Sequence, residues 1–230
     1  MPFQSSVNIA LGAGVVGDVS FESPSRATPY VLSSADASYN VVGRAFTVSS
    51  EGVAAAGGTG IFAGILANPK VYPLQGTSAG TLTPTLTLPN NATAELVTMG
   101  DMYTYLPAAA NIGDLVAYDT TTGALSTTAP VAAFTAAQST TTLTVSAITA
   151  GTLGVGSVVT QASGQLSTII ALGTGTGGTG TYTLDTSQTV SSGAATATSV
   201  AGSGKKFVPN TVVSKFTVSA AGLANITLTN

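Results

Sequence analysis

The sequence of 230 residues contains no cysteine, no histidine and no tryptophan. A chain without cysteine and histidine has no disulfide bond, no thiolate or imidazole metal ligand, and no catalytic scheme built on a histidine base or a cysteine nucleophile. Zinc sites and Ser-His-Asp triads are therefore excluded, and carboxylates remain as candidate acid–base groups. We expect a protein that is not an enzyme and has no catalytic, metal-binding or cofactor-binding residues.

Charge is scarce as well, since 7% of the residues are charged where about a quarter is usual. The net charge of -3 leaves no basic surface of the kind that nucleic acid or anionic lipid requires. We expect neither nucleic acid nor a membrane as a partner. A hydrophobic content of 44% nevertheless argues against disorder and for a folded chain.

Long apolar segments are also missing. The least polar window, residues 54–67, is too short and too rich in glycine to span a membrane, which takes about 20 apolar residues. The first basic residue is Arg26, so no charged segment precedes an apolar core as in a signal peptide. We expect synthesis and folding in a cytoplasm.

Threonine, valine and closely spaced glycines dominate, and long runs at helical spacing are absent, a pattern typical of strands joined by tight turns. The sequence predicts an all-β fold with a β-sandwich or barrel-like main domain. Asp119 is expected to open a hairpin turn, "DTTTG", in which Gly123 takes a positive φ. The predicted strands are 39–48, 60–66, 81–88, 94–106, 114–119, 140–148, 166–172 and 181–186.

Between Asp119 and Asp185 the sequence has no charged residue, and its composition shifts to Thr, Ala, Gly and Ser. This shift predicts a small β domain, residues 131–200, inserted into a main domain formed by residues 31–130 and 201–230. An insertion into an exposed hairpin is tolerated because closing a longer loop costs little entropy.

Residues 1–30 contain Pro2, Pro24 and Pro29 and few large apolar side chains before Tyr30. This composition predicts an extended N-terminal arm rather than part of the core.

The segment "IIALGTGTGGTGTYTL", residues 169–184, contains the spacing Gly-x-Gly-x-x-Gly twice, from Gly173 and from Gly175. A dinucleotide-binding fingerprint requires a helix after the glycines, on whose N-terminus the pyrophosphate rests. Here the following residues alternate with a period of two, as in a strand. A P-loop lysine is absent too, because the next lysine is Lys205. We therefore predict a turn between two strands.

The carboxylates Asp101, Asp114 and Asp119, and the pair Asp18 and Glu22, are candidates for a glycosidase site, which needs two carboxylates about 5 to 10 Å apart. The favoured interpretation is turn formation and solvation, because Asp101 and Asp114 each follow a glycine. A calcium site is less favoured because the sequence has no spaced ladder of Asp and Asn residues.

The basic residues Lys205, Lys206 and Lys215 lie near the return into the main domain. The favoured interpretation is that they are solvated edge lysines, which discourage unwanted strand pairing. The alternative is a salt bridge to an acidic partner surface.

Four stretches, "MPFQSSVN", "VVGRAFTV", "GIFAGILANPKVYPL" and "GDLVAYDTTTGAL", resemble the structural cement, or capsid decoration, proteins of tailed bacteriophages. The inserted segment is similar to a small β module that recurs in phage structural proteins. The resemblance implies a non-enzymatic protein on the outer surface of an icosahedral head, where it bridges subunits of the major capsid protein. It carries over no catalytic residue, and it assigns partner contact to Pro2, Phe3, Gln4, Ser5, Ser6, Val7 and Asn8.

The resemblance also implies a homo-oligomer, for which we favour a trimer over a dimer. An alternative function is a carbohydrate-binding adhesin or fibre module of the phage surface. That alternative rests on the insert rich in Thr, Gly and Ser and on Tyr103, Tyr105 and Tyr182, which we expect to be exposed.

Overall fold

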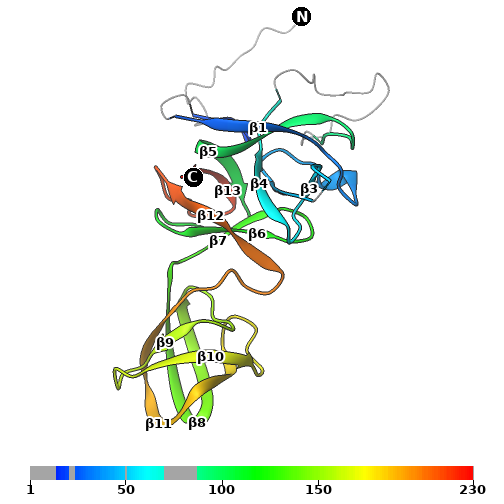
Figure 1. Ribbon diagram of the computed structural model, residues 1–230. Coiled ribbons are helices and arrows are strands. Elements are labelled where there is room, and N and C mark those ends of the chain that lie inside the picture. Colours follow the sequence, from blue (N-terminus) through cyan, green and yellow to red (C-terminus); the bar gives the residue numbers. More distant parts are fainter. Residues whose placement is uncertain (1–13, 21–23, 50, 70–86, 230) are drawn as a thin grey trace, which may run out of the picture.

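A computed structural model describes residues 14–20, 24–49, 51–69 and 87–229 of the protein. Within these residues the fold is all-β, as predicted, with one short 3-10 helix, η1 (Ala37–Tyr39). Thirteen strands form two separate sheets of antiparallel strands (Figure 1). No helix in this described part of the chain is long and apolar enough to cross a membrane.

The main sheet has nine strands, in the order β3-β2-β4-β5-β13-β12-β6-β7, and β1 pairs with β5 outside this path. Eight of its strands are short or of medium length, and β5 is the longest. Their bounds are β1 (Arg26–Val31), β2 (Ala45–Val48), β3 (Ala54–Ala56), β4 (Ile61–Leu66), β5 (Thr93–Leu106), β6 (Leu115–Asp119), β7 (Leu125–Thr128), β12 (Lys205–Ser214) and β13 (Gly222–Leu228).

The two ends of this path are brought together by the turn between β6 and β7. The Ala45 N–H donates to Gly123 O at 2.9 Å, and the Gly58 N–H donates to Thr120 O at 2.6 Å. Gly123 has φ +70°, so the turn predicted from "DTTTG" is confirmed. The main sheet therefore curls into a barrel-like body.

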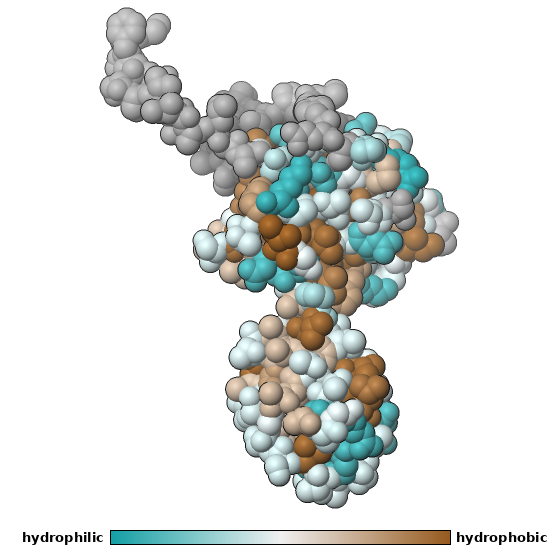
Figure 2. Space-filling view, turned by 90° about the vertical axis from the view of Figure 1, so that its left-hand side faces the viewer, coloured by the Kyte–Doolittle hydropathy of each residue, from teal (hydrophilic) through white to brown (hydrophobic). Residues whose placement is uncertain are grey.

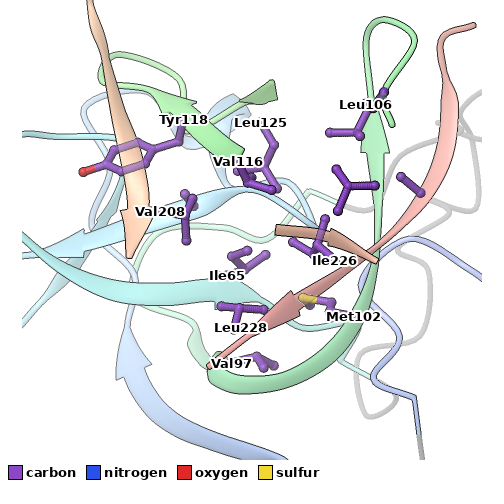
Figure 3. Close-up of a cluster of buried hydrophobic side chains, with 14 of the residues drawn as sticks. Ile65, Val97, Met102, Leu106, Val116, Tyr118, Leu125, Val208, Ile226 and Leu228 are labelled. Atoms are coloured by element: carbon purple, nitrogen blue, oxygen red, sulfur yellow. The ribbon is translucent and has the colours of Figure 1, made fainter. Parts of the chain in front are cut away.

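The inner face of this body is filled by aliphatic side chains from strands distant in sequence (Figure 3). Ile65 from β4, Met102 from β5 and Ile226 from β13 are fully buried. A second cluster around Phe46 and Leu96 fills the other part of the main body. Burial of these side chains is the principal stabilising contribution to the main domain.

The second sheet contains β8 (Val131–Ala150), β9 (Val158–Thr160), β10 (Leu166–Leu172) and β11 (Gly180–Thr198). β8 folds back near Thr140, which has φ +55°. The Ser146 hydroxyl consequently donates to Thr135 O at 3.2 Å, within the same strand. β11 pairs with β8, with β9 near its end and with β10 near its start, and β9 pairs with β10. These pairings close the sheet around its own core, which includes Leu143 and Tyr182.

Two adjacent stretches of chain join the sheets, one before β8 and one after β11. The Ser199 N–H donates to Pro130 O at 3.2 Å across them, and the Thr128 and Thr152 hydroxyls lie 3.1 Å apart. In Figure 1 the second sheet lies at the end of the main body opposite to β1.

Several predicted strands differ from the structure. The predicted strands 140–148 and 181–186 are parts of the longer strands β8 and β11. In the predicted strand 39–48, only Ala45–Val48 is a strand, because Asp36 caps η1 and Gly43 has φ +81°. The predicted strand 81–88 lies outside the described residues except for Thr87 and Leu88.

Candidate functional site

The residues predicted to contact a partner, Pro2, Phe3, Gln4, Ser5, Ser6, Val7 and Asn8, lie outside the described residues. The described chain begins at Gly14, and residues 17–20 run along β5. The Gly17 N–H donates to Tyr103 O at 2.7 Å, and the Ser20 N–H donates to Asp101 O at 2.8 Å. The stretch 14–20, which we call the arm base, is therefore held by the main sheet, and Arg26–Val31 enters the sheet as β1.

Two glycines allow the arm base to approach the main body closely. A Cβ added to Gly14 would lie 2.6 Å from a ring carbon of Tyr103. Gly17 has φ +86°, and a Cβ there would lie 1.9 Å from Val42. Both contacts are shorter than van der Waals distance, so larger residues at these positions would displace the arm base.

An ion pair fixes the other end of the arm base. Lys215 Nζ lies 3.2 Å from Asp101 Oδ2 and donates a hydrogen bond to Ser20 Oγ at 3.2 Å. The Thr227 hydroxyl donates to Asp101 Oδ1. We call Ser20, Asp101 and Lys215 the arm clamp. It joins the arm base, the middle of β5 and the bend after β12.

Exposed apolar side chains lie on the arm base and on the neighbouring part of β5. Val15 is 59% exposed and Tyr105 is 55% exposed. Tyr103 and Tyr105 alternate along β5 and therefore share one face of the strand, and Tyr103 also contacts the backbone of the arm base. We call Val15, Tyr103 and Tyr105 the arm-base surface. It is a candidate site for docking onto a partner.

The prediction that Asp101 lies in a turn is wrong, because Asp101 is buried in the middle of β5. The preceding Gly100 has φ +126°, and a Cβ there would lie 3.0 Å from Ser25. The absence of a side chain at Gly100 therefore allows the segment that leads into β1 to approach β5 closely. The register of β1 and β5 shifts at this point.

Asp114 and Asp119 do form turns. Asp114 Oδ2 accepts from the Asn111 N–H at 2.8 Å, and Asp119 Oδ1 accepts from the Thr121 and Thr122 N–H groups at 2.9 and 2.8 Å. Partial burial raises the pKa of Asp119, but the hydrogen bonds from Thr122 and Thr121, together with Lys205, outweigh this effect and lower the pKa.

The candidate carboxylates do not form a joint site. Asp101 on β5 and Asp114 before β6 are three strand spacings apart in the order β5-β13-β12-β6, roughly 14 Å along the sheet. Asp18 accepts from the Asn68 amide at 3.3 Å, and Glu22 lies outside the described residues. In the described ranges no group of three acidic residues is arranged to hold a metal ion.

The glycine-rich loop joins β10 to β11, so the predicted strand-to-strand turn is confirmed. The N–H groups of Gly173 and Gly175 both donate to Thr181 O, at 2.9 and 3.2 Å. The Tyr182 ring lies beneath the loop, where a Cβ on Gly175 would be 2.4 Å from it. The glycines therefore serve to cover this ring.

Tyr182 is 1% exposed, so the expectation that it is an exposed aromatic side chain is wrong. Its hydroxyl donates to Gly178 O at 2.7 Å and accepts from the Gly177 N–H at 3.1 Å. Burial raises the pKa of Tyr182, against the smaller effect of the hydrogen bond from Gly177. The ring is part of the core of the second sheet.

Lys205 and Lys206 lie on the part of β12 that pairs with β6 alone, because β13 pairs only with Thr211–Ser214. Both lysines are exposed. Lys205 Nζ donates to Ser126 Oγ at 2.9 Å, and Lys206 Nζ donates to Thr59 O at 2.7 Å. Both side chains therefore bind neighbouring segments of the same body. No sequence signal could pair Lys215 with Asp101, since the contact depends on the order of the strands.

A family model described as structural cement protein (E217 gp24/Pam3 gp6) matches residues 3–159. The match includes the arm base, β1 to β8 and the start of β9. No curated protein matches the sequence.

Proposed function

Because the chain belongs to the structural cement protein family, we propose that it decorates the outer surface of an icosahedral phage head and bridges subunits of the major capsid protein. Family membership gives the chain a structural role in the virion, in association with capsid proteins. The finer proposal, the bridging of subunits from outside, rests on the site described above.

Two observations together carry the proposal. The arm base is anchored to the main sheet, and the arm-base surface is next to the anchored backbone. The arm base is hydrogen-bonded to β5, next to the exposed side chains of Val15 and Tyr105. We propose that the arm contacts one capsid subunit while the arm-base surface contacts its neighbour. Extended segments bind well by adding to the sheet edge of a partner.

Binding of this kind stabilises an assembled head by mass action, because the protein binds the joined subunits and not the separated ones. No chemical step is required. The carboxylates Asp101, Asp114 and Asp119 are each occupied by hydrogen bonds within the protein, which supports a non-enzymatic role.

We further propose that residues 131–200 form an inserted domain that projects outward from the head, and that residues 31–130 and 201–230 form the capsid-binding domain. The separate core of the second sheet and its position opposite β1 support this arrangement (Figure 1). We also propose that the protein acts as a homo-oligomer, with a trimer favoured over a dimer.

The test is to mix the purified protein with expanded, undecorated heads. We expect saturable binding and increased resistance of the heads to heat. A variant lacking residues 1–8, and the double variant Val15→Ser/Tyr105→Ser, are expected to bind more weakly. Ile61→Ser, which changes a residue that is 76% exposed elsewhere on the main body, is the matched control and should bind normally. Absence of both saturable binding and protection of the heads would contradict the proposal.

A further inference from the structure

The second sheet exposes several aliphatic side chains on β9, on β10 and in the loop before β9. They are 39% to 62% exposed, and they comprise Val155, Val158, Leu166 and Ile170, which we call the aliphatic stripe. In the view of Figure 2, hydrophobic residues form separate groups on the surface of this body. Exposed apolar sets of this kind commonly mark interaction sites.

The strand register shows why these residues adjoin. Thr168 on β10 is paired with Val158 on β9. Leu166 lies two positions before Thr168, so it projects from the same face of β10. The Gly156 N–H donates to Ile169 O at 2.9 Å, which places the loop of Val155 beside this part of β10. Thr168 therefore lies near the middle of the stripe.

The backbone in this region is not available to a partner strand. β9 pairs with both β10 and β11, and β10 pairs with both β9 and β11. A partner must therefore bind through side chains, and not by adding a strand to the edge of the sheet.

The composition of the second sheet restricts what that partner is. Asp185 is its only charged residue, and residues 131–198 contain no lysine or arginine that could attract an acidic lipid or nucleic acid. Its only aromatic residues, Phe134 and Tyr182, are buried, so no aromatic platform is available for a sugar. A matching surface must be apolar and nearly uncharged, and the same stripe on a second copy has both properties.

We propose that the aliphatic stripe is a self-association surface, through which the second sheets of two copies of this chain pack side chain against side chain. A pair related by a twofold axis would bring each stripe against its own equivalent. The absence of basic residues, and the single acidic residue in each copy, leave little repulsion between the two faces. This inference goes beyond the binding of capsid, and its test in solution requires no head.

The first experiment is sedimentation of the full chain between about 10 μM and about 1 mM, the latter being the local concentration that tethered neighbours experience. We expect concentration-dependent self-association. Leu166→Asp/Ile170→Asp should raise the dissociation constant by at least about tenfold. The control Thr189→Asp/Ala194→Asp adds the same charge at exposed positions of β11 and should leave the constant unchanged.

A second pair of variants introduces no charge, so it tests the inference even if the Asp variants misfold. The chain contains no cysteine, so a single introduced thiol reports proximity between copies. Under oxidation Thr168→Cys should form far more disulfide-linked dimer than Thr189→Cys. A chain that remains monomeric at about 1 mM, equal self-association of the two Asp double variants, or equal cross-linking of the two Cys variants would each overturn the inference. Failure to bind heads would affect only the proposed function.

Discussion

Lys215 Nζ lies 3.2 Å from Asp101 Oδ2, and the same ammonium group donates to Ser20 Oγ. This contact connects three segments far apart in the sequence, and it holds the Ser20 end of the arm base against the main sheet. The Asp101 carboxylate, which resembled a turn residue in the sequence, is therefore an internal support of the candidate docking site.

Removal of the Asp101 carboxylate should destabilise the protein and loosen the arm base. Asp101→Ala removes the carboxylate that pairs with the Lys215 ammonium and accepts from the Thr227 hydroxyl, so we expect a loss of about 2 to 4 kcal/mol in the free energy of unfolding. Urea denaturation measures this loss, and limited proteolysis should show faster cleavage near Ser20. Lys206→Met, which removes an exposed ammonium group elsewhere on the main body, should cost less than about 1 kcal/mol. Equal losses in the two variants would contradict the role of the clamp.

In the glycine-rich loop, an added methyl group should destabilise the protein at Gly175 and have little effect on stability at Gly178. Gly175→Ala would place a Cβ 2.4 Å from the Tyr182 ring, and we expect a loss of about 1 to 3 kcal/mol from overpacking. Gly178→Ala meets no atom within 4 Å and has no positive φ, so its effect should be small. Thermal unfolding of the two variants compares the sites directly. A Gly178→Ala variant as unstable as Gly175→Ala would mean that backbone flexibility, and not coverage of Tyr182, explains the glycines.

The turn at Asp119 should contribute to stability at neutral pH and lose that contribution in acid. Its pKa in the folded protein lies below the ordinary value of 3.8, so the folded state favours the charged form. The contribution is present above the pKa of the unfolded state and disappears as the pH falls through the lower folded pKa.

Urea denaturation from pH 7 to pH 2 tests this assignment. We expect Asp119→Asn to be less stable than the unaltered protein at pH 7, with the difference shrinking as the Asp119 carboxylate becomes protonated. Glu51→Gln removes a carboxylate from an exposed turn and serves as the control. A difference for Asp119→Asn that does not depend on pH would contradict the explanation.

The two sheets have separate hydrophobic cores, so the main domain should fold without the second sheet. We expect replacement of residues 133–201 by a short Gly linker to leave a soluble, cooperatively unfolding protein. Far-UV circular dichroism and size-exclusion chromatography provide the measurement. Aggregation of the shortened chain would show that the cores depend on each other.

The sequence predicted seven of the thirteen described strands in whole or in part, because their alternation is a local property. Leu166–Leu172 has the expected bounds, the strand that ends at Asp119 begins one residue later than predicted, and the turn with Gly123 at positive φ follows from its residue types. The fold class also followed from composition, because abundant β-branched residues and closely spaced glycines favour strands.

The arrangement of side chains between strands could not be predicted in the same way. Asp101 follows a glycine, a pattern typical of turns, yet Gly100 serves a close approach inside the sheet. Tyr182 alternates with threonines as a half-exposed strand residue would, but the glycine-rich loop covers it completely. Both errors arise because burial depends on which segment lies above a strand, and a local pattern does not contain that information.

The most direct test of the central claim is the amount of this chain in purified, mature phage particles. Quantitative mass spectrometry should find it in a fixed ratio to the major capsid protein, and particles stripped of it should lose heat resistance. A chain that is abundant in infected cells but missing from the mature particles would contradict its role as a capsid cement.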